Sequence, residues 1–242
     1  MKRHFTKGMS LGIVAIVFIV GLLWAAAIPA DKAEEIAKYV ANMIIAGRGV
    51  VASHQSLIND PSKGDKGFTP KYVEKKMKER FKEITGKSVE ELDPEARAVV
   101  EQVIEAAKMS VKMNQARINQ KGKGFKMYIP AVFGRETGQI LKSRSDIVIK
   151  QTTFKYRNSY NQPDEFEKKV LTMFSKPDWP KGKGYGEKIG SIYRYLQPIY
   201  IKKPCLKCHG EPAGELDIAG RKKEGYKLGD LRGAISVMFP VK

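Results

Sequence analysis

Both cysteines of the chain fall in one short segment, Cys205-Leu206-Lys207-Cys208-His209. This Cys-x-x-Cys-His order is the attachment sequence of c-type haem. Two thiols three positions apart can each form a thioether with one vinyl group of the same porphyrin, and the histidine that follows can present its imidazole to the iron. We therefore predict one covalently attached haem c, bound by Cys205, Cys208 and His209, with His209 as an iron ligand.

Three other uses of the thiols compete with this interpretation. A redox-active dithiol normally opens a helix after a strand in a thioredoxin-like unit, and the sequence indicates no such unit. A structural zinc ion needs four ligands, so it would have to recruit His209 and a distant residue such as His54. A disulfide across two residues would close a small strained loop and leave the adjacent histidine unexplained.

The sixth iron position has several candidates. His4 precedes the apolar N-terminal segment, which leaves His54 as the predicted distal ligand. A histidine at the end of an apolar helical stripe is also commonly a packed boundary residue, so that alternative stays open. Met109 and Met113, on a predicted long helix, are competitors, and an empty or water-filled position is the remaining option.

Residues 1–30 predict export. A basic flank precedes an uncharged apolar run of 18 residues, 11–28, which is at the lower limit for a membrane span. Alanines at 25–27 offer a cleavage site, but we favour an uncleaved membrane anchor over a removed signal peptide. The flank would keep the N-terminus in the cytoplasm and place residues 31–242 in the periplasm or extracytoplasmic space.

The charge balance favours anionic partners, because 44 Lys and Arg stand against 26 Asp and Glu, a formal net charge of +18. Anionic lipid headgroups, an acidic redox or signalling partner protein and the haem propionates fit this charge. Nucleic acid is excluded as a partner, since no binding motif is found and an exported chain would not meet DNA. A homodimer is a further possibility. No catalytic triad, phosphate loop or carboxylate pair is recognised, so we expect no enzyme.

The first half of the chain predicts helices and the second half predicts strands. Apolar residues follow a helical stripe over 36–54, and further helices are expected over 70–84 and 94–118, the last capped by Asp93. Strands are expected over 147–154, 189–200 and 234–241, with a short helix over 164–174. Helices followed by an antiparallel sheet predict an α+β fold in one domain, residues 31–242, after the N-terminal transmembrane or signal helix.

A weak internal echo lies in the helical half. The segment Gln55, Ile58, Asn59, Lys66, Gly67, Phe68 resembles Gln115, Ile118, Asn119, Lys123, Gly124, Phe125. These pairs have no fixed offset, so the echo is poor evidence for a repeat.

Several stretches resemble a known family. The haem-attachment segment, the stretch from Glu224 to Ser236, and the segments 57–68 and 124–133 are similar to exported single-haem c-type domains with a PAS-like fold, first catalogued as a domain of unknown function. The resemblance implies a PAS-like antiparallel sheet preceded by long N-terminal helices, with His209 as the proximal ligand. It implies a membrane-tethered redox or small-ligand-responsive haem protein. The alternative is a periplasmic one-electron carrier between larger redox complexes.

Overall fold

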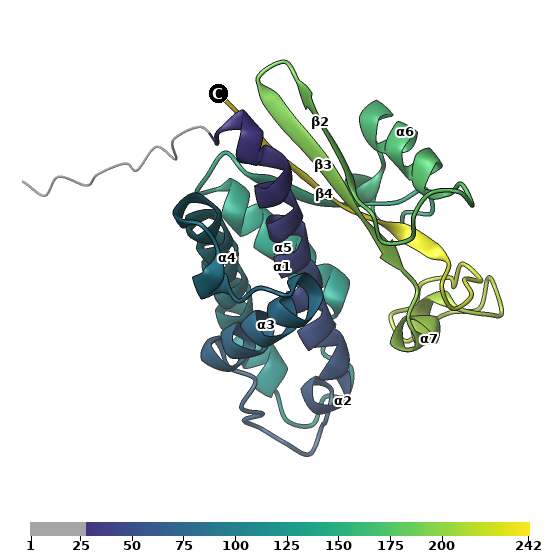
Figure 1. The fold of residues 1–242 in the computed structure, drawn as a ribbon. Helices are drawn as coiled ribbons and strands as arrows, with labels where there is room; N and C mark the ends of the chain where they lie inside the picture. Colours follow the sequence, from purple (N-terminus) through teal and green to yellow (C-terminus); the bar gives the residue numbers. More distant parts are fainter. Residues whose placement is uncertain (1–27) are drawn as a thin grey trace, which may run out of the picture.

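The structure is a computed structural model that describes residues 28–242. It combines helices with one four-stranded antiparallel sheet, so the predicted α+β class is confirmed (Figure 1). The strands are β1 (Val148–Thr152), β2 (Tyr185–Ile189), β3 (Ile192–Tyr200) and β4 (Leu231–Pro240), and they lie in the order β1-β4-β3-β2. Several predicted strand boundaries were wrong: β1 ends before Phe154, which is exposed, and β4 begins at Leu231. The strand predicted over 189–200 begins only at Ile192, because Ile189 ends the separate strand β2, which was not predicted.

One helix lies at the centre of the molecule. The helices are α1 (Ala33–Ser53), α2 (Gln55–Ile58), α3 (Pro70–Thr85), α4 (Pro94–Asn119), α5 (Pro130–Lys142), α6 (Glu165–Phe174) and α7 (Leu206–His209). Figure 1 shows α1 between α3 and α4 on one side and the sheet on the other. The apolar stripe predicted for α1 is buried at Ile36, Val40, Met43 and Val50. This stripe joins the helical layer to the sheet.

The predicted helix ends are confirmed by their caps. The Thr69 side chain accepts a hydrogen bond from the main-chain nitrogen of Tyr72 at 3.2 Å, and Asp93 accepts one from Ala96 at 3.1 Å. Each of these caps precedes a proline at the first helical position. Gly86 ends α3 in a left-handed conformation with φ of 77°, which glycine adopts without strain.

Sequence patterns did not predict α5. Two glycines interrupt it, and glycine disfavours a helix interior. The structure shows why one of them is needed: a Cβ atom on Gly138 would lie 2.6 Å from the main-chain oxygen of Ile149. The close approach of α5 to β1 therefore requires a residue without a side chain at this position.

The two faces of the sheet carry different cores. The face toward the helices belongs to the main core, with Tyr195, Val237 and Phe239 buried among the helical side chains. The opposite face holds a smaller cluster in which Phe166 and Leu171 of α6 pack with strand residues. The predicted helical insertion between the first strands is thus the cover of this second face.

The structure corrects the register of the internal echo and gives it a fixed offset of 60 residues. Lys66 corresponds to Lys126 rather than Lys123, because the residue after each has the same unusual backbone: φ is 62° at Gly67 and 61° at Met127. The side-chain ammonium of Lys66 donates to the main-chain oxygen of Lys63, and that of Lys126 donates in the same way to Lys123.

The two repeated loops also bind each other reciprocally. Asn59 Oδ1 accepts a hydrogen bond from the main-chain nitrogen of Lys126 at 2.8 Å, and its counterpart Asn119 accepts one from Lys66 at 3.3 Å. The helical half is therefore two related hairpins, α1 to α3 and α4 to α5, joined through their loops. This register is hidden in the sequence, because the letters Lys-Gly-Phe recur at 123–125, whereas the structural counterpart of 66–68 is Lys126-Met127-Tyr128.

The predicted N-terminal anchor lies almost entirely outside the described residues, since these begin at Ile28. That residue forms an isolated parallel bridge with Val241, so the described chain starts beside the end of β4. Within residues 28–242, no helix has the length and apolar character needed to cross a membrane.

Candidate functional site

Cys205, Cys208 and His209 lie together in the turn after β3. A short 3-10 helix (Lys203–Cys205) leads directly into α7, which ends at His209. Side chains three positions apart on a helical turn project to the same side. Both thiols are free and half-buried. A single turn therefore presents two unpaired thiols, which thioether attachment of a porphyrin requires, and one imidazole, which can bind iron.

The imidazole of His209 is held through one of its two nitrogens. Nδ1 lies 2.8 Å from Oε2 of Glu224. Because a carboxylate only accepts hydrogen bonds, we assign the proton to Nδ1 and the lone pair to Nε2. Burial lowers the pKa of His209 more than the hydrogen bond to Glu224 raises it, so the ring is neutral at neutral pH. Nε2 is then the nitrogen that can bind a metal.

Arg157 ties the segments around the motif together. Its guanidinium donates to Oδ2 of Asp217, to Oε1 of Glu224 and to the main-chain oxygen of Cys208, each at 2.6 Å. The side chain of Asp217 is 1% exposed and that of Glu224 is 11% exposed. Charge-assisted hydrogen bonds in such a partly buried place are strong, so they fix these segments relative to one another.

Both carboxylates of this cluster are ionised at neutral pH. Burial raises the pKa of Glu224, but the hydrogen bonds from His209 and Arg157 outweigh it and lower the pKa to about 2. Burial likewise acts to raise the pKa of Asp217, and the main-chain nitrogen of Arg221 and the Arg157 guanidinium lower it overall.

The site does not favour the dithiol or zinc alternatives. Burial, and after it the charge of Asp217, raises the pKa of Cys208. Reactive dithiols instead have a lowered pKa. A zinc site would need a group of ligands, and among residues 28–242 no three His, Cys, Asp or Glu side chains are grouped to hold a metal ion.

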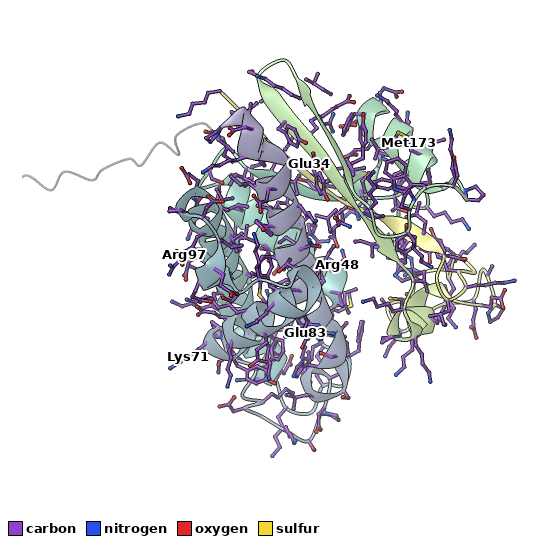
Figure 2. All side chains as sticks on the ribbon, viewed as in Figure 1. Glu34, Arg48, Lys71, Glu83, Arg97 and Met173 are labelled. Carbon is purple, nitrogen blue, oxygen red and sulfur yellow. The ribbon has the colours of Figure 1, made fainter. Side chains whose placement is uncertain are left out.

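Two further arginines lie near the motif. Figure 2 shows Arg48 on α1, where its side chain also approaches Gly134 of α5. Burial, followed by the charge of Arg232, lowers the pKa of Arg48 to about 10, and Cys205 acts in the opposite sense. No acidic side chain of the described chain offsets this burial. A half-buried guanidinium beside a second one is suited to a carboxylate ligand.

The predicted distal ligand, His54, lies at the junction of α1 and α2. Its Nδ1 is 2.7 Å from the main-chain oxygen of Val50 and its Nε2 is 2.8 Å from the hydroxyl of Tyr72. The ring also packs against Phe68, with 5.4 Å between centroids. Iron binding through Nε2 would require Tyr72 to turn away. Distal ligation by His54 stays a prediction.

The repeat provides a structural counterpart for His54. Sixty positions later stands Asn114, whose side chain donates to the main-chain oxygen of Ser110 at 2.8 Å. This bond reaches four residues back along the helix, as the bond from His54 to Val50 does. A role at the end of α1 is therefore available to His54 without iron.

The methionine competitors both lie on α4, which packs against α1, α3 and α5. Met109 is half-buried, and 67% of Met113 is exposed. Nothing in the described structure brings either sulfur to His209, and their ligation also stays a prediction.

Sequence reasoning missed Arg157, Asp217 and Glu224. Arg157 lies 51 positions before Cys208, and only the fold brings it to the motif. A signal for one of them was present, because Glu224 opens the stretch Glu224-Gly-Tyr-Lys-Leu-Gly-Asp that carried part of the family resemblance. The chemistry of that stretch becomes visible only when its carboxylate is seen on His209.

Comparison with known proteins gives a family. The family described as Tll0287-like matches residues 86–240, which include the attachment motif, Arg157 and Glu224. Among the solved structures, that of the cyanobacterial heme-protein Tll0287 is 18% identical, with a TM-score of 0.44, and the match covers 62% of this chain and 97% of that one. The search of curated proteins found no match.

Proposed function

The chain belongs to the Tll0287-like family, and from this premise we propose that it is a haem protein with one covalently attached c-type haem at Cys205 and Cys208. The observation that carries the proposal is the turn at 205–209, which presents two free thiols and an imidazole with Nδ1 already occupied. The family takes its description from Tll0287, a cyanobacterial heme-protein.

The surrounding residues fit the group. Cys205 and Cys208 would form the thioethers, and His209 would bind iron through Nε2. The guanidinium groups of Arg48 and Arg232 would bind the propionates, which is a use for the otherwise unfavourable burial of Arg48 next to another positive charge. When bound, the haem supplies a one-electron redox centre and an iron that can bind small ligands.

We extend the proposal to the setting of the domain. A PAS-like arrangement is supported by the antiparallel sheet, by α6, which lies between β1 and β2 in the chain, and by the long helices that precede the sheet. Membrane tethering and a periplasmic location are supported by the sequence of residues 1–28. In this setting the haem would respond to redox state or to a small ligand.

A one-electron carrier is the second candidate function. It is favoured by the exposed lysines 202, 203 and 207, which stand next to the attachment cysteines. Positive side chains around a redox centre steer an acidic partner to it.

Absorption spectra test the proposal. The chain is produced in a host with haem c maturation machinery, and oxidised, reduced and carbon-monoxide-treated spectra are recorded. Haem bands that remain with the chain in a denaturing gel are expected, and their absence would overturn the proposal. A shift with carbon monoxide supports ligand sensing, whereas a low-spin spectrum that is indifferent to the gas supports the carrier.

Single cysteine variants assign the attachment. Cys205→Ala and Cys208→Ala are each expected to leave one thioether, which moves the α band of the reduced pyridine complex. The double variant should lose its haem on denaturation. Unchanged covalent haem in the double variant would contradict attachment at this motif.

A further inference from the structure

The Glu224 carboxylate is surrounded by four nitrogen atoms from three side chains. Oε2 lies 2.8 Å from Nδ1 of His209 and 2.8 Å from Nη2 of Arg157. Oε1 lies 2.6 Å from Nε of Arg157 and 3.6 Å from Nη2 of Arg232. Both oxygens are thus fixed, and one of them is directed at the imidazole.

The main chain holds this contact in register. The nitrogen of Gly225 donates to the oxygen of Gly210 at 3.2 Å, and that of Tyr226 donates to the oxygen of His209 at 2.9 Å. The segment that follows Glu224 therefore runs beside the end of the attachment turn. These main-chain hydrogen bonds hold the backbone next to Glu224 close to His209, which keeps the carboxylate within reach of the imidazole.

We propose that Glu224 is a positioning residue that fixes His209 in its Nδ1–H form and lowers the reduction potential of iron bound at Nε2. This inference rests on the haem proposed above. An anionic acceptor draws the Nδ1 proton toward itself and makes Nε2 a stronger donor. A stronger donor favours the ferric over the ferrous state, which lowers the potential.

The charges around Glu224 can also act on the reduction potential of the iron. The cluster contains two carboxylates, Glu224 and Asp217, and two guanidiniums, Arg157 and Arg232, so its formal charges cancel. Glu224→Gln and Asp217→Asn each remove one negative charge from this cluster, so their through-space effects on the iron have the same sign. The effect that distinguishes Glu224 from Asp217 is its hydrogen bond to His209.

This distinction supplies a matched control. Asp217→Asn removes one carboxylate from the same guanidinium as Glu224→Gln does, but it does not touch His209. Redox titration of the haem-loaded full chain is expected to give a higher potential for Glu224→Gln than for Asp217→Asn. Glu224→Asp, which keeps the charge, should lie closer to the unmodified chain. Equal shifts for Glu224→Gln and Asp217→Asn would overturn the inference.

A second measurement tests the position of the proton on His209 without haem, so it applies also to variants that attach none. The ¹⁵N chemical shifts of the imidazole in the unloaded full chain report which ring nitrogen carries the proton. The Nδ1–H form is expected to dominate with Glu224 and to lose that dominance in Glu224→Gln. A dominant Nε2–H form in the unmodified chain would overturn the inference. If the unmodified chain never binds haem while this tautomer is found, the proposed function fails and only the positioning role stands.

Discussion

The guanidinium of Arg157 donates a hydrogen bond of 2.6 Å to the main-chain oxygen of Cys208. Through this bond a residue in the loop after β1 contacts the turn after β3 that carries Cys205, Cys208 and His209. The same guanidinium holds Asp217 and Glu224, so three separate segments share one side chain.

Replacing Arg157 with Gln is expected to destabilise the fold by about 3 kcal/mol, because it leaves Asp217 buried without its cationic partner. Urea unfolding followed by circular dichroism measures the change. Arg221→Gln is the control, since that side chain is exposed, and it should remain within about 0.5 kcal/mol of the unmodified chain. Equal free energies of unfolding for the two variants would contradict the role given to Arg157.

The contribution of Asp217 should depend on pH. Its pKa is lowered in the folded state, so it binds a proton more weakly there than in the unfolded chain, where the value is about 4. The stabilisation is therefore complete above that value and is lost as the pH falls below it. Urea unfolding at several pH values should show a gap between the unmodified chain and Asp217→Asn at pH 7 that narrows in acid. A constant gap would argue against ionised Asp217.

The reciprocal loop contacts predict two related variants. Asn59→Ala and Asn119→Ala should each lower the free energy of unfolding by about 1 kcal/mol, because each leaves a main-chain N–H in the partner loop without its acceptor. The exposed neighbour Gln120→Ala provides the comparison and is expected to change little. Should both asparagine variants behave like Gln120→Ala, the loops would not stabilise each other.

Gly138→Ala should be destabilising by about 2 kcal/mol, since the new methyl group meets the main chain of β1 and α5 must shift. Gly124→Ala is a suitable control because a Cβ at that position meets no atom within 4 Å. Thermal unfolding of both variants measures the difference. A Gly138→Ala chain as stable as the control would show that α5 can move away from the sheet at no cost.

If His54 is the sixth ligand, His54→Ala should convert a low-spin haem to a high-spin or mixed one. Tyr72→Phe removes the hydroxyl that now occupies Nε2 and should keep the low-spin spectrum. Absorption and electron paramagnetic resonance spectra distinguish these states. An unchanged spectrum in His54→Ala, together with a lower stability, would assign His54 to the structural role that Asn114 has in the second hairpin.

Local patterns were sufficient for much of the fold. The first residues of α3 and α4 follow from Thr69-Pro70 and Asp93-Pro94, because a capping side chain and a proline act only on the first turn of the helix. The helix α5 was not predictable from such rules. The need for Gly138 is explained only by its close approach to Ile149, next to which it lies in the folded chain.

The candidate site divides in the same way. The sequence by itself determined which residues are the candidate donors, Cys205, Cys208 and His209, since the spacing of two thiols and an imidazole in one turn is a local property. Only the tertiary structure decided that Arg157 and Glu224 hold this turn, and that Nε2 is the available nitrogen of His209. Contacts between residues far apart in the chain depend on how the sheet and loops close in space, and no local spacing records that closure.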